Sequence, residues 1–113
     1  MTDWLPRQLD ICAKFGASFT PSSSHDKLGV ADNLSLKPLN GLRQQPQART
    51  CGWYLWSGPH FSGPPEYFSP LQVSDLERLC PDVIPFLGLA PGWRFLVDGE
   101  YVDVWFDEQL PTV

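Results

Sequence analysis

Residues 91–108 run Pro91-Gly92-Trp93-Arg94-Phe95-Leu96-Val97-Asp98-Gly99-Glu100-Tyr101-Val102-Asp103-Val104-Trp105-Phe106-Asp107-Glu108. Two stretches rich in aromatic and β-branched residues flank Asp98-Gly99, the dipeptide that best supplies the positive φ angles of a two-residue type I′ turn. The segment is therefore predicted to form a β-hairpin.

The position of the turn sets which residues of the hairpin face each other. A turn at Asp98-Gly99 pairs Val97 with Glu100 and Arg94 with Asp103. Side chains alternate between the two faces of a strand. One face is then apolar and predicted to pack on the core: Trp93, Phe95, Val97, Val102 and Val104. The other face carries the Arg94–Asp103 pair, with Leu96, Tyr101 and Trp105 beside it.

Two helices are predicted elsewhere in the chain. Residues 3–15 have apolar side chains at helical spacing, with Thr2 or Asp3 as the N-terminal cap and Gly16 as the stop. The face of this helix that turns to the core is predicted to carry Leu5, Leu9, Cys12 and Ala13, and a second stripe suggests burial on more than one side. Further along, Ser74-Asp75-Leu76-Glu77 fits a capping box. The helix that follows should be kinked or split by Pro81 and Pro85 and end at Gly88.

Two strands are predicted between these helices. Residues 29–39 alternate loosely and should form a strand that ends near Pro38, followed by a turn at Asn40-Gly41. Residues 43–50 show no periodicity and are predicted to be an exposed loop, as are residues 59–65. Residues 52–58 form an intensely aromatic strand that is apolar on both faces, so it is either central in the sheet or presents a contact surface.

The whole chain, residues 1–113, is predicted to be one domain. A domain of this size buries roughly two-thirds of the surface of its unfolded chain, which suffices for a core without disulfides or metals. The expected fold class is α+β, from the order helix, strand, strand, helix, hairpin. The sheet should be small, antiparallel or mixed, with about four strands including the C-terminal hairpin. It should pack against the N-terminal helix and the proline-kinked second helix.

Charge is unevenly distributed along the chain. Residues 1–65 hold six basic and four acidic side chains, whereas residues 66–113 hold two basic and nine acidic ones, and the net charge is −5. Nucleic acid is not expected as a partner, because phosphate binding needs clustered Lys and Arg. A basic protein fits this charge distribution better, since opposite fields speed encounter and reject wrong partners.

The cysteines and the N-terminus indicate a cytoplasmic protein. Cys12, Cys51 and Cys80 are odd in number and widely spaced, so we expect buried, reduced thiols rather than disulfides. The first residues have neither a basic region nor a long apolar stretch, so no secretory signal and no membrane span are expected.

Catalytic and metal-binding patterns are weak. His25 and His60 lie far apart in expected loops, and neither stands four residues from another ligand as in a helical zinc site. Cys12 and Cys80 lie on apolar helical stripes, where a thiol is inert packing, while the reactivity of Cys51 is left open. We therefore predict no catalytic residue, no cofactor and no metal. The C-terminal carboxylates keep one alternative open, a small enzyme or ligand-binding domain that acts on a sugar.

Protein binding agrees better with the sequence. Interface hot spots are enriched in Trp, Tyr and Arg surrounded by polar residues. Four aromatic side chains could project from one sheet face beside Arg94, unless helices cover that face and the aromatics are core. The predicted partner-binding residues combine these aromatics with the hairpin acids: Tyr54, Trp56, Asp98, Glu100, Tyr101, Asp103, Trp105, Asp107 and Glu108.

Three segments in order resemble a known bacterial family. They are Asn33-Leu34-Ser35-Leu36-Lys37-Pro38-Leu39-Asn40-Gly41-Leu42-Arg43, then Cys51-Gly52-Trp53-Tyr54-Leu55-Trp56, and then Leu87-Gly88-Leu89-Ala90-Pro91-Gly92-Trp93-Arg94-Phe95-Leu96 through Trp105-Phe106-Asp107-Glu108. The chain resembles the immunity-protein-like domains numbered thirty-three among the immunity families of polymorphic toxin systems. The likeness covers roughly residues 33–110 and leaves the N-terminal helix and the Ser-rich loop outside.

The resemblance implies a cytoplasmic immunity protein that binds and neutralises a cognate bacterial toxin. It brings no catalytic signature with it. Together with the charge distribution, it predicts a toxin with a basic surface, bound by the acidic C-terminal region. An accessory or regulatory domain without a toxin partner remains a further alternative, and the oligomeric state is left open.

Overall fold

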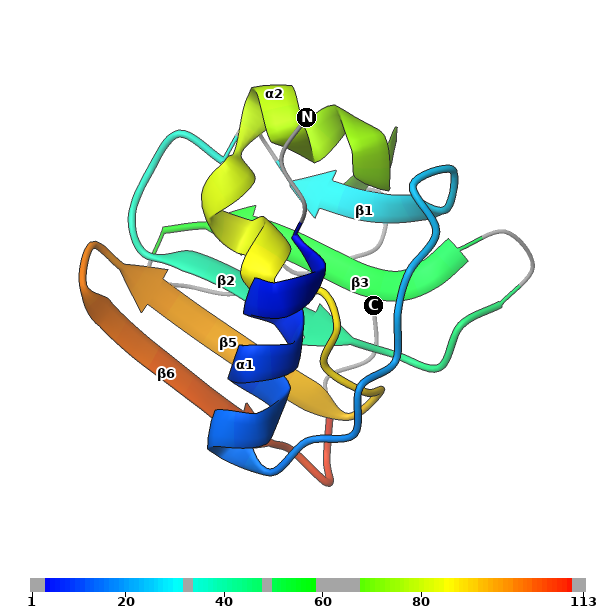
Figure 1. Ribbon diagram of the computed structural model, residues 1–113. Helices are drawn as coiled ribbons and strands as arrows, with labels where there is room; N and C mark the ends of the chain where they lie inside the picture. The colour runs from blue at the N-terminus through cyan, green and yellow to red at the C-terminus, as the bar shows by residue number, and fades with distance from the viewer. Residues whose placement is uncertain (1–3, 32–33, 48–49, 59–67, 111–113) are drawn as a thin grey trace.

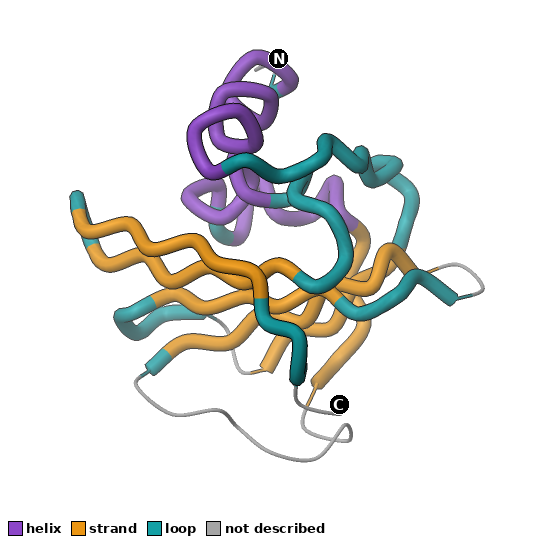
Figure 2. The backbone as a smooth tube through the Cα atoms, turned by 90° about the horizontal axis from the view of Figure 1, so that it is seen from below, coloured by secondary structure: helices purple, strands orange, loops and turns teal. Residues whose placement is uncertain are grey.

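The computed structural model describes residues 4–31, 34–47, 50–58 and 68–110. These residues form one six-stranded mixed sheet with a layer of short helices on one side (Figures 1 and 2). The predicted α+β class, the N-terminal helix and the C-terminal hairpin are confirmed. The prediction of about four strands is wrong, because the sheet has six.

The helical elements are α1 (Leu5–Phe15), η2 (Val73–Asp75), α2 (Leu76–Leu79) and η3 (Pro81–Phe86). The strands are β1 (Lys27–Ala31), β2 (Leu39–Arg43), β3 (Thr50–Ser57), β4 (Phe68–Gln72), β5 (Trp93–Asp98) and β6 (Tyr101–Phe106). In space the strands follow the order β4-β1-β3-β2-β5-β6. β1 and β3 are parallel, and the other neighbouring pairs are antiparallel.

The hairpin forms as predicted, but its register is two residues away from the prediction. Asp98 pairs with Tyr101, so the two turn residues are Gly99 and Glu100 rather than Asp98 and Gly99. Gly99 has φ +61°, and Glu100 is not among the residues with positive φ. Positive φ at the first turn position alone is the requirement of a type II′ turn, which glycine meets there.

The predicted assignment of side chains to the two faces of the hairpin is still right, because a register shift of two residues leaves each side chain on the same face. Phe95 and Val104 are paired and buried on the helix side of the sheet. The predicted Arg94–Asp103 pair is wrong, since Arg94 lies opposite Trp105. Val102 is on the predicted core face but is 38% exposed, and it borders a cavity between the hairpin and residues of the helical layer, among them Trp4 and Phe86.

Helix α1 packs on the core with a different face from the predicted one. Leu5 and Leu9 are exposed, and Cys12 is the buried residue. The Gln8 side chain donates to the Ile84 carbonyl at 3.0 Å, and the Cys12 thiol to the Gly88 carbonyl at 3.4 Å. These polar contacts align α1 along η3. The predicted caps Thr2 and Asp3 lie outside the described residues, while the stop at Gly16 is confirmed by its left-handed φ of +79°.

The predicted strand over residues 29–39 is wrong. The structure divides this region into β1, which ends at Ala31, and β2, which begins at Leu39. Asn40-Gly41 is not a turn but lies buried inside β2. Gly41 is required there because a Cβ atom would overlap the ring of Phe95. The Asn40 amide is satisfied by the Gly58 carbonyl at 2.9 Å.

Strand β3 is central, and both of its faces are covered in part. Trp53 and Leu55 are fully buried on the helix side, whereas Trp56 is 2% exposed on the opposite side. Strand β4 was not predicted. It contains Pro70, which suits an edge strand, where one row of backbone N–H groups has no ladder partner.

The second helical region is split as predicted, into α2 and η3, with the break before Pro81. The capping box, however, stands two residues earlier than predicted, between Gln72 and Asp75. The Asp75 carboxylate accepts the Gln72 backbone N–H at 3.1 Å. Glu77 instead accepts the indole N–H of Trp4 at 2.7 Å, which ties the start of α1 to α2.

Arg43 is predicted to lie in an exposed loop, but it is 1% exposed at the end of β2. Its guanidinium donates to the carbonyls of Cys51 (2.9 Å), Thr20 (2.6 Å) and Leu89 (2.7 Å), and to the hydroxyl of Ser22 (3.2 Å). It also lies 5.7 Å from the Trp53 ring centroid. Burial lowers the pKa of Arg43, with nearby Cys51, Asp26 and Cys12 opposing this. The side chain therefore joins β2, β3, the loop after α1 and the segment before β5.

Candidate functional site

The sheet face opposite the helices, called the open face below, is the candidate site. Figure 2 shows the described helices on the other side of the sheet. The strand register assigns the side chains of this face as follows: Phe68 and Pro70 from β4, Gly29 and Ala31 from β1, Tyr54 and Trp56 from β3, Asn40 and Leu42 from β2, Arg94, Leu96 and Asp98 from β5, and Tyr101, Asp103 and Trp105 from β6.

The four predicted contact aromatics do lie on this one face, but they are spread across it. Tyr54 aligns with Leu42, Leu42 with Arg94, and Arg94 with Trp105. With neighbouring strands about 4.8 Å apart, Tyr54 and Trp105 stand roughly 14 Å from each other. The open face is therefore a band of aromatic and apolar side chains rather than a single cluster.

Arg94 lies on β5, next to the edge strand β6. Its guanidinium is 5.4 Å from the Trp105 ring centroid and 5.9 Å from that of Trp56, within the range of cation–π attraction. It also forms an ion pair with Asp107 at 3.0 Å. Arg94 thus links β3, β5 and the segment after β6, and this fixes the orientation of the Trp105 ring.

Asp107 is already engaged within the chain. Its carboxylate accepts the Gln109 backbone N–H at 2.9 Å and the Arg94 guanidinium at 3.0 Å. The Gln109 hydrogen bond first, and Arg94 second, hold the pKa of Asp107 below its ordinary value. Of the predicted acidic contact residues, Asp107 is therefore the one whose charge is balanced internally.

The other four hairpin acids are exposed. Asp98 and Glu100 lie at the turn end, Asp103 in the middle of β6 and Glu108 beyond its end. None of them forms an ion pair with another described residue. Their negative charge is directed outward along one margin of the sheet.

The predicted aromatic residues differ widely in exposure. Tyr101 is 60% exposed, and Tyr54 and Trp105 are half-buried. Trp56 is 2% exposed and packs with Ala31 and Leu42 in a cluster to which Leu110 adds, so this part of the open face is covered within the chain and the indole is not available to a partner.

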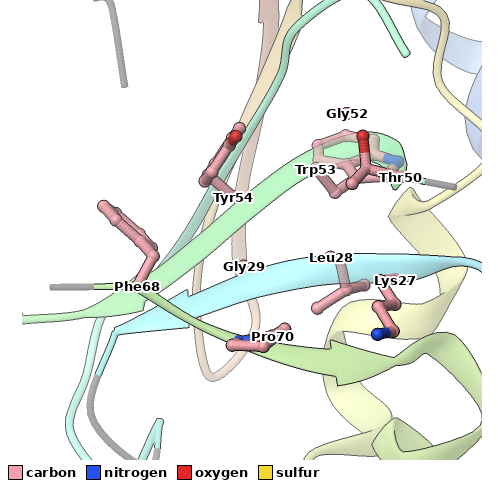
Figure 3. A pocket seen from close by; sticks show the side chains of 9 residues that line it. All are labelled: Lys27, Leu28, Gly29, Thr50, Gly52, Trp53, Tyr54, Phe68 and Pro70. Carbon is pink, nitrogen blue, oxygen red and sulfur yellow. The ribbon is translucent and has the colours of Figure 1, made fainter. Parts of the chain in front are cut away.

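A cavity of about 210 Å³ opens at the β4 end of this face (Figure 3). Tyr54 and Phe68 form an edge-to-face pair at 5.3 Å on one side of it. The other residues that line it are Lys27, Leu28, Gly29, Thr50, Gly52, Trp53 and Pro70. Small-molecule sites usually measure about 300–1,000 Å³, so this cavity is smaller than the usual binding site of a cofactor.

Of the residues around this cavity, sequence reasoning singled out Tyr54 and missed the others. Gly29 carries the signal that could have revealed them, because an isolated glycine inside a strand often marks a bulge or a close approach. The β1–β3 register shifts between Lys27 and Gly29, and a Cβ at Gly29 would lie 2.8 Å from the Tyr54 ring. The glycine thus allows the Tyr54 and Phe68 rings to meet.

Within the described part of the chain, no group of three His, Cys, Asp or Glu side chains could hold a metal ion. His25 is exposed, and His60 lies outside the described residues. Cys12, Cys51 and Cys80 are buried free thiols, as predicted. Burial raises the pKa of Cys12, against the influence of Arg43, and burial likewise raises that of Cys80. The helices of the described residues include none that is long and apolar enough to cross a membrane.

Comparison with known protein families identifies the family of the chain. The family model of the Imm33-like domain matches residues 7–107. This confirms the resemblance seen in three segments of the sequence and extends it, because the match includes most of α1 and the Ser-rich loop, which were placed outside. No curated protein and no solved structure matches the chain.

Proposed function

The chain belongs to the family of Imm33-like domains, and from this we propose that it is an immunity protein that binds a cognate bacterial toxin and blocks it by protein–protein contact. The toxin is proposed to present a basic surface to the hairpin. Protection is stoichiometric, so each chain neutralises one toxin molecule and carries out no chemistry on it.

The observation that carries this proposal is the set of exposed hairpin carboxylates. Asp98, Glu100, Asp103 and Glu108 have no ion-pair partner among the described residues. Exposed like charges along one margin repel each other mildly and do not help the chain to fold. They attract an oppositely charged partner, raise the association rate and select against acidic surfaces.

The aromatic residues beside these acids supply the second component of an interface. Tyr101 and Trp105 lie on the open face on either side of Asp103. Interfaces gain most of their affinity from a few Trp, Tyr and Arg side chains surrounded by polar groups. Trp105 is held in place by Arg94, so little conformational freedom is lost when a partner packs against it.

The alternative of a carboxylate-using enzyme finds less support. The cavity of about 210 Å³ on the open face has no acidic residue in its lining, and the cavity of about 270 Å³ on the helix side includes Asp82 but none of the hairpin acids. Asp107, the hairpin acid closest to a base, has a lowered pKa, the opposite of what a general acid needs. We therefore propose a binding protein and not an enzyme, acting in the cytoplasm, where an incoming toxin would have its target.

Co-expression tests the proposed function. The product of the adjacent open reading frame is expressed alone, with this chain, and with this chain replaced by an unrelated acidic protein of similar size. We expect growth arrest in the first and third cultures and normal growth in the second, with a one-to-one complex on purification. A neighbour that is harmless alone, or equally lethal in all three cultures, would contradict the proposal.

A further inference from the structure

The outer edge of β6 has hydrogen-bonding groups that the hairpin does not use. The Asp107 backbone N–H donates to the Gly92 carbonyl at 2.9 Å, which makes Gly92 and Asp107 a hydrogen-bonded pair. Hydrogen-bonded and non-hydrogen-bonded pairs alternate along an antiparallel ladder. In this register the backbone N–H and C=O groups of Tyr101, Asp103 and Trp105 form hydrogen bonds with β5. Those of Val102, Val104 and Phe106 point away from β5.

Nothing in the described part of the chain pairs with this outer row. β6 is the last strand in the sheet order and forms its margin in Figure 1. No backbone hydrogen bond joins Val102, Val104 or Phe106 to another described residue beyond β5. Three of the seven exposed large hydrophobic residues of the described chain lie on this strand: Tyr101 (60%), Val102 (38%) and Phe106 (52%).

The two edges of the sheet are protected to different degrees. Natural edge strands are usually blunted by proline, lysine, a bulge or a covering segment. β4, at the other edge, contains Pro70. β6 has neither proline nor lysine, its single charged residue is Asp103, and its six residues pair with β5 in unbroken register. A regular, apolar edge of this length is a template for another strand.

We propose that an extended segment of the toxin pairs with the outer edge of β6 and becomes a seventh strand of the sheet. This inference rests on the proposed function, because the partner it names is the toxin. Backbone hydrogen bonds to Val102, Val104 and Phe106 supply part of the affinity, and alternating side chains supply the specificity.

The two sides of the edge define the chemistry of the incoming segment. On the open face, Asp103 lies between Tyr101 and Trp105, so the segment carries Lys or Arg on that side. On the helix side, Val102 borders a cavity of about 270 Å³ whose lining includes Trp4, Pro85 and Phe86 together with Arg7 and Asp82. The segment therefore places there a long side chain with an apolar stem, and its sequence carries basic residues on the alternate positions that face Asp103.

A second copy of the same chain is a poorer occupant of this edge. β6 carries Asp103 and no basic residue, and acids flank it at both ends. Pairing two such strands brings like charges onto adjacent strands, which is destabilising. The charge of the edge thus selects a basic partner over self-association.

Amide hydrogen exchange, followed by NMR, tests the pairing residue by residue. The probe is the toxin domain encoded by the adjacent open reading frame, added to the full chain. On complex formation the amides of Val102, Val104 and Phe106 should slow by roughly tenfold or more, because each gains an interstrand bond. Those of Tyr101, Asp103 and Trp105, already bonded to β5, should change much less.

Three other results of this experiment would each contradict strand addition, the proposed function or both. If a complex forms and the three outward amides exchange as before, strand addition is wrong while the proposed function stands. If no complex forms, the proposed function fails and this inference fails with it. If the three amides are already protected in the free chain, and more so at higher concentration, a second copy occupies the edge and the inference is wrong.

A proline substitution gives an independent test. Val102→Pro removes an outward N–H without breaking a bond to β5, and proline is tolerated at such edge positions. The variant should keep its far-ultraviolet circular dichroism and lose roughly tenfold or more in affinity for the toxin domain. The control Val102→Thr keeps the N–H and should bind within about threefold of the wild-type affinity. Phe106→Pro serves the same purpose if Val102→Pro does not fold. Unchanged affinity in a folded proline variant would overturn the proposal.

Discussion

Arg43 and Arg94 lie on adjacent strands, close to tryptophan rings, but on opposite faces of the sheet. Arg43 is 1% exposed, and its donors reach carbonyl groups from several segments. The Arg94 side chain is 19% exposed and pairs with Asp107, while its buried Nε finds no acceptor among the described residues. The helix-covered face is closed by hydrogen bonds that hold the fold, whereas on the open face Tyr101 and Trp105 keep exposed surface, which we propose contacts another molecule.

The largest expected difference comes from removing each arginine in turn. Arg43→Met leaves several buried carbonyls without a donor, each at a cost of about 1–3 kcal/mol, so the free energy of unfolding should fall by roughly 3–5 kcal/mol. Arg94→Met should cost clearly less, because the side chain is partly exposed. Denaturant unfolding of both variants measures this, and equal losses would remove the contrast between the two faces.

Two glycines sharpen the same comparison. At Gly41, on the helix side, a Cβ would overlap the Phe95 ring, which is fixed by stacking on Phe86 at 4.8 Å. Gly41→Ala should destabilise the fold by about 1–3 kcal/mol or more. At Gly29 the neighbour is Tyr54, which is half-buried and can shift. Gly29→Ala should therefore lower the thermal stability less than Gly41→Ala does. A larger loss of stability at Gly29 than at Gly41 would contradict the idea that side chains on the open face can shift to make room for a Cβ.

The charge of the hairpin should act on association rather than on stability. Asp103→Lys removes an exposed acid between Tyr101 and Trp105 and introduces a base. Association with the toxin domain at low salt should slow on the order of tenfold, with less effect at high salt. Asp10→Lys is the matched control, because it makes the same change in net charge on exposed α1. Equal slowing by both variants would show that only net charge matters.

The smallest effect concerns the pH dependence of stability. The pKa of Asp107 is lowered by the Gln109 N–H and Arg94, so its ionised form stabilises the folded state. This stabilisation is fully present above the unfolded pKa of about 3.9 and is lost as pH falls through the lower folded pKa. Wild type should thus be slightly more stable than Asp107→Asn at pH 7, and the difference should vanish in acid. A difference that persists at low pH would have another origin.

The sequence predicted the hairpin and its faces better than the register. Gly99 fits the second central position of a type I′ turn at Asp98-Gly99 and also the first central position of a type II′ turn at Gly99-Glu100. The Asp98-Gly99 dipeptide alone therefore does not decide between the two turns. The faces were nevertheless right, because the two registers differ by an even number of residues. Tyr101 and Trp105 could be placed on one face for the same reason, whereas the face of Tyr54 depends on the pairing of β3 with β2 and of β2 with β5.

The errors in the rest of the sheet have physical causes. β2 is buried along its whole length, so its residues do not alternate in polarity, and Asn40-Gly41 resembles a turn. β4 is short and contains Pro70, which local rules assign to a loop. The burial of Arg43 depends on carbonyls far away in the sequence, which no local pattern reveals. The Tyr54–Phe68 cavity was missed because it requires the pairing of β1 with both β3 and β4.

Trp105 tests most directly the claim that the open face serves binding while the helix-covered face holds the fold. Trp105→Ala should reduce affinity for the toxin domain by roughly tenfold or more, while the free energy of unfolding changes by about 1 kcal/mol or less. Trp53→Ala, on the other face, should instead lose roughly 3–5 kcal/mol of stability. The decisive measurement is calorimetric titration of folded Trp105→Ala with the toxin domain. A loss of affinity in this folded variant is the predicted result, and an affinity equal to that of the wild type would contradict the account.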